Sequence, residues 1–353
     1  MQAIRTPTAE RVPPAMPPAV ELVDDAAWNR MTSDQSPLAD IEWIRCHANA
    51  FGGAVQLHRV RRDGRLVAGV PLIRDDGFSR VWVTQDSEHC PYRPISGELT
   101  REEARELLDH LLADAEGVVL RRLPVASPSC DALRAAAADL GLPIALVHGE
   151  PGDARIALDG RPPPRRFAKD LDRQRRLLER HGALELAVVT SPGVELVSSL
   201  DEAFELETLG WEGRGGAPIC ADGSTLRFYA ELAHALAARG RFALYTLRLG
   251  GKLIAFEYTL RGGGHIELLK YSFDPAYASH SPGQLLRILI LERETALGRV
   301  HAYHLGRPSP WKQRWATDVA PLCTLRIYAA TPRGRAAHII GSVRSRVNAA
   351  LAR

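Results

Sequence analysis

A stretch early in the chain recurs in its second half, and this internal repeat limits the possible folds more than any other feature. Residues 57–72 read LHRVRRDGRLVAGVPL, and residues 244–260 read LYTLRLGGKLIAFEYTL. Each copy alternates apolar and polar residues on both sides of a DG or GG turn, which predicts a β-hairpin. Arg61 matches Arg248, and the other identical pairs keep the same offset. Because this offset is close to half of the 353 residues, the repeat indicates duplication of one domain.

The segments after the two hairpins also correspond. After the first hairpin we expect a strand, a helix, a strand and a helix at residues 80–84, 101–115, 118–123 and 130–140. After the second we expect a strand, a helix and two strands at residues 265–273, 283–298, 300–305 and 323–329. The sequence therefore predicts an α/β (α+β) protein of two related domains, each a mixed, mostly antiparallel sheet flanked by helices. It has no dinucleotide fingerprint, which argues against a classical Rossmann domain.

Length and composition are those of a two-domain globular protein. The 353 residues exceed one typical domain, and 45% apolar with 25% charged residues is ordinary. A net charge of +3 is too small to indicate DNA as a partner. No apolar run approaches the ~20 residues that span a bilayer, so we expect no membrane span.

The N-terminal residues and the cysteines indicate in which cellular compartment we expect the protein. The first residues are rich in proline and alanine and have no continuous apolar core, so we expect residues 1–20 to be a flexible tail and not a signal peptide. The five cysteines are scattered and lack CxxC spacing, which favours a reducing cytoplasm and argues against a metal site or a disulfide framework. Arginine greatly outnumbers lysine, as is typical of a GC-rich bacterial genome.

Residues 264–315 contain a candidate phosphate site. A strand ends at YSFDP, the loop AYASHSPG follows, and a helix begins with QLLRILI. The first amides of a helix have no partner within it, and the helix dipole places partial positive charge there. The amides that follow Ser281, Pro282 and Gly283 therefore predict a site for the phosphate of a nucleotide-bearing substrate.

Three blocks carry a resemblance to a known family. They are GWEGRGGAPI at residues 210–219, YSFDPAYASHSPGQLL at 271–286 and PWKQRWA at 310–316. Together they resemble the BioF2-like or CelD-type acetyltransferases of the GNAT superfamily, relatives of the FemAB-type transferases with duplicated GNAT domains. The resemblance implies tandem GNAT-like domains, at residues 21–160 and 161–353, with the acyl-donor site in the second.

The resemblance also implies transfer of an acyl group from acyl-CoA, acetyl-CoA above all, to an amine. The pantetheine arm would lie between residues 268–271 and 302–305 as an added strand. The pyrophosphate would meet the amides around Ser281, Gly283 and Gln284. The oxyanion that develops would be held by the backbone N–H of Leu269 or Lys270.

A general base and a proton donor are expected as well, because the attacking amine must be neutral. Glu267 and His304 are the first candidates for the base, and Tyr271 is the candidate to protonate the thiolate. Glu257 and His265 are further candidates on the paired strands. The alternative for each acidic or imidazole group is a charge on the solvent side of a sheet, and for Tyr271 a half-buried strand residue.

The expected substrate-binding residues are Trp211, Glu212, Trp311 and Lys312. Relatives carry an aspartate where His304 stands and a lysine where Glu212 stands, so the acceptor is expected to differ, and an anionic acceptor is one possibility. A lysine packed on a tryptophan ring is the alternative for Lys312.

Two other functions remain open from the sequence. The basic helix within residues 165–181 suits an aminoacyl-tRNA donor, as in a Fem-like transferase, although acidic residues interleave with it as on a solvated face. A catalytically silent ligand-binding protein of the same fold is the third reading. In the leading reading the acceptor is a small-molecule or sugar-type amine bound between the two domains.

Overall fold

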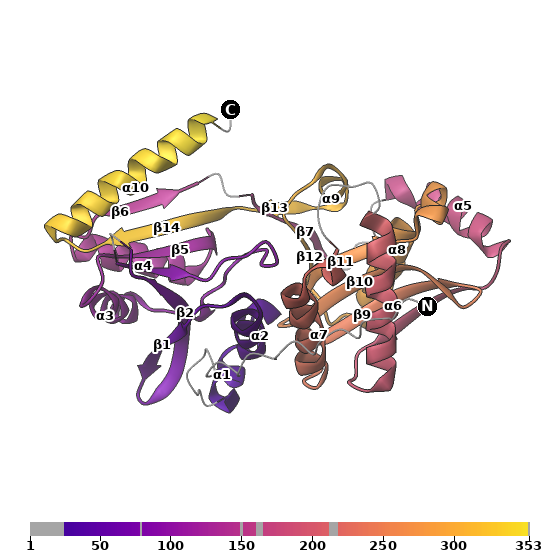
Figure 1. The fold of residues 1–353 in the computed structure, drawn as a ribbon, viewed down its shortest axis with the longest axis horizontal. Helices are drawn as coiled ribbons and strands as arrows, with labels where there is room; N and C mark the ends of the chain where they lie inside the picture. Colours follow the sequence, from indigo (N-terminus) through magenta and orange to yellow (C-terminus); the bar gives the residue numbers. More distant parts are fainter. Residues whose placement is uncertain (1–24, 78–79, 149–150, 160–164, 212–217, 352–353) are drawn as a thin grey trace, which may run out of the picture.

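The computed structural model describes residues 25–77, 80–148, 151–159, 165–211 and 218–351, and the structural statements below concern these residues. The flexible tail expected at residues 1–20 lies outside them. The chain forms two seven-stranded mixed sheets that lie side by side, with helices packed against each (Figure 1). This confirms the expected fold class.

The first sheet has the order β1-β2-β3-β5-β14-β6, with β4 beside β2. Its strands are β1 (Val55–Arg62), β2 (Arg65–Asp75), β3 (Val81–Thr84), β4 (Ser96–Gly97), β5 (Gly117–Pro124), β6 (Ile144–Val147) and β14 (Leu322–Tyr328). The accompanying helices are α1 (Asp25–Met31), α2 (Ile41–Phe51), α3 (Arg101–Leu112), α4 (Pro128–Asp139) and α10 (Pro332–Leu351). Helix α3 begins with a capping box between Thr100 and Glu103, which satisfies two free amides of its first turn.

The second sheet has the order β13-β7-β12-β11-β10-β9-β8. Its strands are β7 (Asp153–Ala157), β8 (Leu184–Val189), β9 (Phe242–Leu249), β10 (Lys252–Gly262), β11 (His265–Phe273), β12 (Ala302–Gly306) and β13 (Asp318–Ala320). Its helices are α5 (Arg165–Glu179), α6 (Val194–Trp211), α7 (Gly223–Ala237), α8 (Pro282–Leu297) and α9 (Pro310–Trp315). Short 3-10 turns lie at Pro37–Ala39, Ile219–Ala221 and Pro275–His280.

The two hairpins of the repeat have the same geometry. Arg61 lies opposite Leu66 in the first, and Arg248 lies opposite Leu253 in the second, so equivalent residues pair. In each sheet the strand that follows the hairpin pairs in parallel with the next one, β3 with β5 and β11 with β12. The order β1-β2-β3-β5 therefore repeats as β9-β10-β11-β12.

The strands at the junction are exchanged between the halves. We expected residues 323–329 to complete the second half, but β14 lies between β5 and β6 of the first sheet (Figure 1). The apolar residues Leu325 and Ile327 are buried in the core of that sheet, which explains the pairing. In return, β7 pairs with β12 of the second sheet. Two strands therefore lie across the boundary expected at residue 160.

Helices α2 and α7 join the two halves through one apolar core. The rings of Trp43 on α2 and Phe228 on α7 meet edge to face at 5.3 Å, and both are buried. Asp40, which caps α2, pairs with Arg239 and Arg241 at the end of α7 and the start of β9. This shared core fixes the positions of the two halves relative to each other. No helix within the described ranges is long and apolar enough to cross a bilayer.

Candidate active site

Strands β11 and β12 separate part of the way along their length. They pair in parallel from His265 opposite Ala302 to Glu267 opposite His304. Beyond this point β11 continues to Phe273 beside β10 alone, while β12 stays paired with β7 as far as Gly306. The edge of β11 from Leu268 onward therefore faces a gap where backbone groups can pair with a ligand.

A β-bulge lies at the start of this gap. Tyr258 of β10 lies opposite Lys270, and the next residue, Thr259, lies opposite Leu268. Leu269 is thus the extra residue and has no counterpart in β10. A bulge leaves its extra residue unpaired and redirects the local backbone. The amides near Leu269, to which the family resemblance assigns the oxyanion, therefore lie at the irregular part of the strand.

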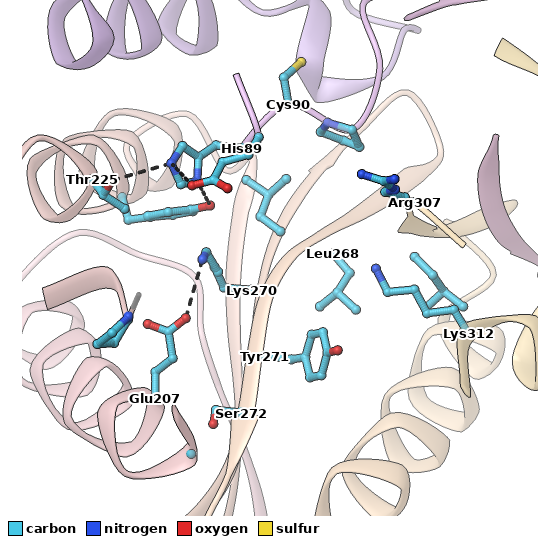
Figure 2. A pocket seen from close by; sticks show the side chains of 18 of the residues that line it. His89, Cys90, Glu207, Thr225, Leu268, Lys270, Tyr271, Ser272, Arg307 and Lys312 are labelled. Atoms are coloured by element: carbon cyan, nitrogen blue, oxygen red, sulfur yellow. Dashed lines mark hydrogen bonds and ion pairs between the residues drawn. The ribbon is translucent and has the colours of Figure 1, made fainter. Parts of the chain in front are cut away.

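A cavity of about 820 Å³ opens at the gap (Figure 2). Leu268, Lys270 and Tyr271 line it from β11, and Arg307 and Lys312 line it from the segment after β12. Helices α6 and α7 contribute a second wall, and residues 88–91 of the first half contribute a third. The cavity therefore lies between the two halves, where the acceptor is expected.

On one face of β11, Lys270 points toward α6 and α7 (Figure 2). Its Nζ lies 3.5 Å from Oε1 of Glu207 and 5.3 Å from the centre of the Tyr229 ring. Glu207 is buried and also accepts the N–H of Ile219 at 2.7 Å. These contacts fix the carboxylate and the ammonium at the wall of the cavity.

On the other face, Tyr271 joins α9. Trp311 donates its Nε1–H to the Tyr271 hydroxyl at 3.0 Å, and the Arg287 guanidinium of α8 lies 4.3 Å from the centre of the Trp311 ring. Arg287 in turn forms a buried ion pair with Glu257, which also accepts a hydrogen bond from Tyr303. Glu257 is thus held in place by its ion pair with Arg287 and its hydrogen bond with Tyr303.

Lys312 carries an ammonium that faces the cavity (Figure 2). Burial, and after it the charge of Arg287, lowers the pKa of Lys312 to about 8. Its Nζ lies 5.6 Å from the centre of the Trp311 ring. Within the described residues no carboxylate lies at ion-pair distance from this ammonium. The position of Lys312 is therefore compatible with both interpretations from the sequence, packing on a tryptophan ring and contact with a ligand.

Glu267 and His304 belong to a buried network at the junction of the halves. Ser36 and Tyr92 donate hydrogen bonds to Oε1 of Glu267 at 2.9 and 2.5 Å, and Asp153 bonds to Nδ1 of His304 at 2.5 Å. Burial raises the pKa of Glu267 to about 7. Burial alone lowers the pKa of His304, but the carboxylates of Glu267 and Asp153 outweigh it and raise that pKa.

This network does not reach the cavity wall. Neither Glu267 nor His304 is among the residues that line the cavity, and both are buried. His265 completes the network through Nδ1, which lies 2.9 Å from Nε2 of His304. The catalytic roles expected for Glu267 and His304 stay predictions. Sequence reasoning missed Ser36, Tyr92 and Asp153, because nothing in their local sequence indicates a contact with the second half.

The start of α8 offers fewer amides than the sequence suggested. The N–H of Ser281 donates to Ala278 O at 3.1 Å, and the N–H of Gln284 donates to Ser281 O at 3.0 Å. Pro282 has no N–H. The expectation of several free amides is therefore corrected, because a left-handed Ser281 folds the turn onto itself. Of the three expected donors, the amide of Gly283 remains for a phosphate.

Of the two loop residues expected to bind substrate, the structure describes the position of one. Trp211 is the last residue of α6, and Gly210, which precedes it, lines the cavity. Glu212 lies outside the described residues. The roles of both stay predictions.

Comparison with known proteins bears on the expected family. Residues 165–313 match the model of the acetyltransferase (GNAT) domain. This match confirms the expected resemblance to the GNAT superfamily over these residues. No curated protein matches the sequence.

Three solved structures share the fold over nearly the whole chain. FemX is 12% identical, with 90% of this chain and 99% of that chain covered and a TM-score of 0.61. The C-terminal domain of a putative lysylphosphatidylglycerol synthetase from Agrobacterium fabrum is 14% identical, with 89% and 93% covered and a TM-score of 0.55. L-PGS from Bacillus licheniformis is 14% identical, with 92% and 96% covered and a TM-score of 0.52.

Proposed function

We propose that this protein is an N-acyltransferase that moves an acyl group from acyl-CoA to an amine held between its two halves. One observation carries the proposal. Strands β11 and β12 separate beside the bulge at Leu269, and the gap opens onto a cavity of about 820 Å³. A thioester donor needs such an open strand edge with a backbone donor beside it.

The donor is expected to lie along β11. The pantetheine amides pair with the open edge at residues 268–271 in the manner of an added strand. The acyl carbonyl then meets the N–H of Leu269 or Lys270, which stabilises the negative oxygen of the tetrahedral intermediate. The pyrophosphate lies near the amide of Gly283, where the dipole of α8 favours negative charge. Tyr271 lines the cavity, which supports its proposed role as the proton donor for the departing thiolate.

The acceptor enters from the side of the first half. Arg307 and Lys312 are cationic groups on the cavity wall, which suits an acceptor that carries a carboxylate or a phosphate besides its amine. Lys270 is paired with Glu207 and is less available for such a contact. Trp311 contributes by holding Tyr271 and Arg287 in place.

An aminoacyl-tRNA donor is the second candidate. The fold likeness extends over 99% of FemX, and two further likenesses are to the C-terminal domain of a putative lysylphosphatidylglycerol synthetase and to L-PGS. An ester carbonyl can use the same backbone donor as a thioester. The basic helix within residues 165–181 is the part of the sequence that suits RNA.

Thermal-shift titration of the full chain tests these readings. A ligand that binds only the folded state raises its stability, by about 2.7 kcal/mol at a hundredfold excess over Kd. We expect acetyl-CoA and longer acyl-CoAs to raise the melting temperature and tRNA to leave it unchanged. A shift with tRNA alone would favour the second candidate. Binding of acyl-CoA with no consumption in the presence of amines would favour a silent binding protein.

A further inference from the structure

Four polar side chains form a continuous chain along the cavity wall opposite β11. They are Asp222, Thr225, His89 and Tyr229, and all four line the cavity. Thr225 lies 3.5 Å from Nε2 of His89, and the Tyr229 hydroxyl lies 3.2 Å from Nδ1 (Figure 2). The chain crosses between the halves, because His89 comes from the first and the other three come from the start of α7.

The ring of His89 is held in place by packing. It stacks on Phe51 of α2 with the ring centres 4.8 Å apart and an interplanar angle of 16°. It meets the ring of Tyr229 edge to face at 5.6 Å. A planar imidazole fixed on both sides keeps its two nitrogens directed at the neighbouring hydroxyls.

Each hydrogen bond in this chain is donated toward Asp222. Thr225 donates its hydroxyl proton to Oδ2 of Asp222 at 2.7 Å, so its oxygen is left to accept from Nε2–H of His89. Nδ1 is then the unprotonated nitrogen and accepts from the Tyr229 hydroxyl. The lone pairs of that phenol oxygen are available for a further donor, such as an amine N–H in the cavity.

We propose that His89, acting through the Tyr229 hydroxyl, removes the proton of the attacking acceptor amine. The first half thus supplies the base for a donor bound to the second. This inference rests on the proposed acyl transfer.

The step balances in atoms and electrons. The amine nitrogen uses its electron pair to form the bond to the carbonyl carbon. Its N–H proton moves to the phenol oxygen of Tyr229 as the Tyr229 hydroxyl proton moves to Nδ1 of His89. The carbon–sulfur bond then breaks, and the thiolate takes the hydroxyl proton of Tyr271, which regains a proton from solvent. The imidazolium returns its proton to solvent before the next turnover.

The charges around His89 suit a base that is neutral at rest. Burial, followed by the ammonium of Lys270 on β11, lowers the pKa of His89. Glu88 on its own loop and Asp222 at the start of α7 act in the opposite direction. Arg122 of β5 also lines this part of the cavity. Oε1 of Glu88 lies 3.7 Å from Nε2 of His89, so this carboxylate can pair with the ring when the ring becomes charged.

Other candidate bases are less well placed. Glu267 and His304 lie in the buried network and not at the cavity wall. Glu207 reaches the cavity, but its two oxygens are taken by Lys270 and the N–H of Ile219. His89 is an imidazole at the wall whose acceptor nitrogen is linked to a cavity hydroxyl.

The tautomer of His89 can be measured without any substrate. In the ¹⁵N-labelled full chain, long-range ¹⁵N–¹H correlation should show His89 protonated at Nε2 and unprotonated at Nδ1 near neutral pH. The His89→Gln variant assigns the signal. Tyr229→Phe should move the Nδ1 shift, because it removes the hydroxyl donor and keeps the ring. Protonation at Nδ1 in the wild type would overturn the direction of the chain.

Kinetics test the role itself. Acetyl-CoA is supplied with a panel of primary amines, and thiol release is followed. For the amine that turns over, His89→Gln should lower kcat by about 10²- to 10⁴-fold, as expected for loss of general base catalysis, with the KM for acetyl-CoA unchanged. The wild-type rate should fall as pH drops through the lowered pKa of His89, and the variant should lack this limb.

The control variant is His47→Gln. His47 packs against the same Phe51 at 4.9 Å and is hydrogen-bonded to Ser87 at 2.7 Å but lies outside the cavity lining, so its loss tests local structural disruption without loss of the proposed base. An equal fall in kcat for both variants, or an unchanged kcat in His89→Gln, would overturn the proton-transfer role. Absence of acetyl-CoA binding to the wild type, or binding without turnover of any amine, would instead overturn the proposed function.

Discussion

Oδ2 of Asp40 and Nη1 of Arg241 lie 2.6 Å apart, although 201 positions separate the two residues in the chain. Asp40 also accepts a hydrogen bond from Arg239 at 2.7 Å and caps α2 through the N–H of Glu42. The carboxylate is fully buried. The Asp40 side chain therefore caps a helix of the first half and forms ion pairs with two arginines of the second.

Asp40→Asn should strongly destabilise the protein. The amide keeps the shape and the helix cap but leaves two guanidinium groups without their counter-charge, and breaking a buried pair in this way costs about 3–5 kcal/mol. Asp139→Asn is the control, because its pair with Arg101 is exposed to solvent and should contribute little to stability. Urea unfolding measures both. Equal losses in the two variants would contradict the importance of this contact.

Lys312→Met should stabilise the fold and impair function. The ammonium is largely buried with its pKa lowered to about 8, so its charged form is penalised in the folded state at neutral pH. Because the folded pKa lies below the ordinary value of 10.5, this penalty disappears as pH rises through that range. We expect a gain of roughly 1–3 kcal/mol at pH 7 that vanishes near pH 10.

The same variant should raise the KM for an anionic acceptor by tenfold or more, which corresponds to about 1.4 kcal/mol of binding free energy. Lys252→Met is the matched control, since Lys252 is exposed and paired with Asp274. An unaltered KM in Lys312→Met would leave Lys312 as a residue that only packs on Trp311.

Gly283→Asp should weaken acyl-CoA binding, whereas Gly283→Asn should not. A Cβ at this position meets only Phe273 at 3.5 Å, an ordinary contact, so both side chains fit. The carboxylate stabilises the start of α8 by its interaction with the helix dipole but repels a pyrophosphate there. Calorimetric titration with acetyl-CoA at low salt measures the difference. Identical affinities for the two variants would argue against a phosphate at this helix.

Glu267→Gln should change how stability depends on pH. The folded-state pKa of about 7 is above the ordinary 4.5, so the protonated carboxyl is favoured on folding. This contribution is present below pH 4.5 and is lost as pH rises through 7. The wild type should therefore lose up to about 3 kcal/mol relative to the glutamine variant across this interval. Glu106→Gln, at an exposed site of α3, should run parallel to the wild type.

The exchange of β7 and β14 between the halves predicts which fragments of the chain unfold cooperatively. A fragment of residues 161–353 lacks β7 and carries β14 without the strands that flank it, so we expect it to aggregate or to unfold without cooperativity. A fragment of residues 151–321 contains every strand of the second sheet and should unfold more cooperatively. Urea unfolding followed by circular dichroism compares them. Cooperative unfolding of 161–353 alone would contradict the exchange.

Local features of this chain could be predicted from its sequence. The hairpins follow from alternation around Gly64 and Gly251, and the start of α8 follows from the loop before it. The oxyanion donor that the family resemblance implies near Leu269 stays a prediction. These features depend on residues that are close in the chain.

Features that depend on distant partners could not be predicted. The apolar pattern of β14 fits either sheet, and only the buried positions of Leu325 and Ile327 show which one it completes. The contacts of Tyr92 with Glu267 and of His89 with Tyr229 join residues from different halves. A tyrosine or histidine in an irregular loop gives no local signal of such a contact.

The place of β14 also has a consequence for synthesis on the ribosome. Strands β5 and β6 emerge early, but β14, which joins them, emerges only after every strand of the second sheet. The first sheet therefore stays incomplete between β5 and β6 while the second sheet forms. The cavity walls contributed by the two halves should become rigid only after β14 has emerged, so that a chain cut short before β14 has no assembled site.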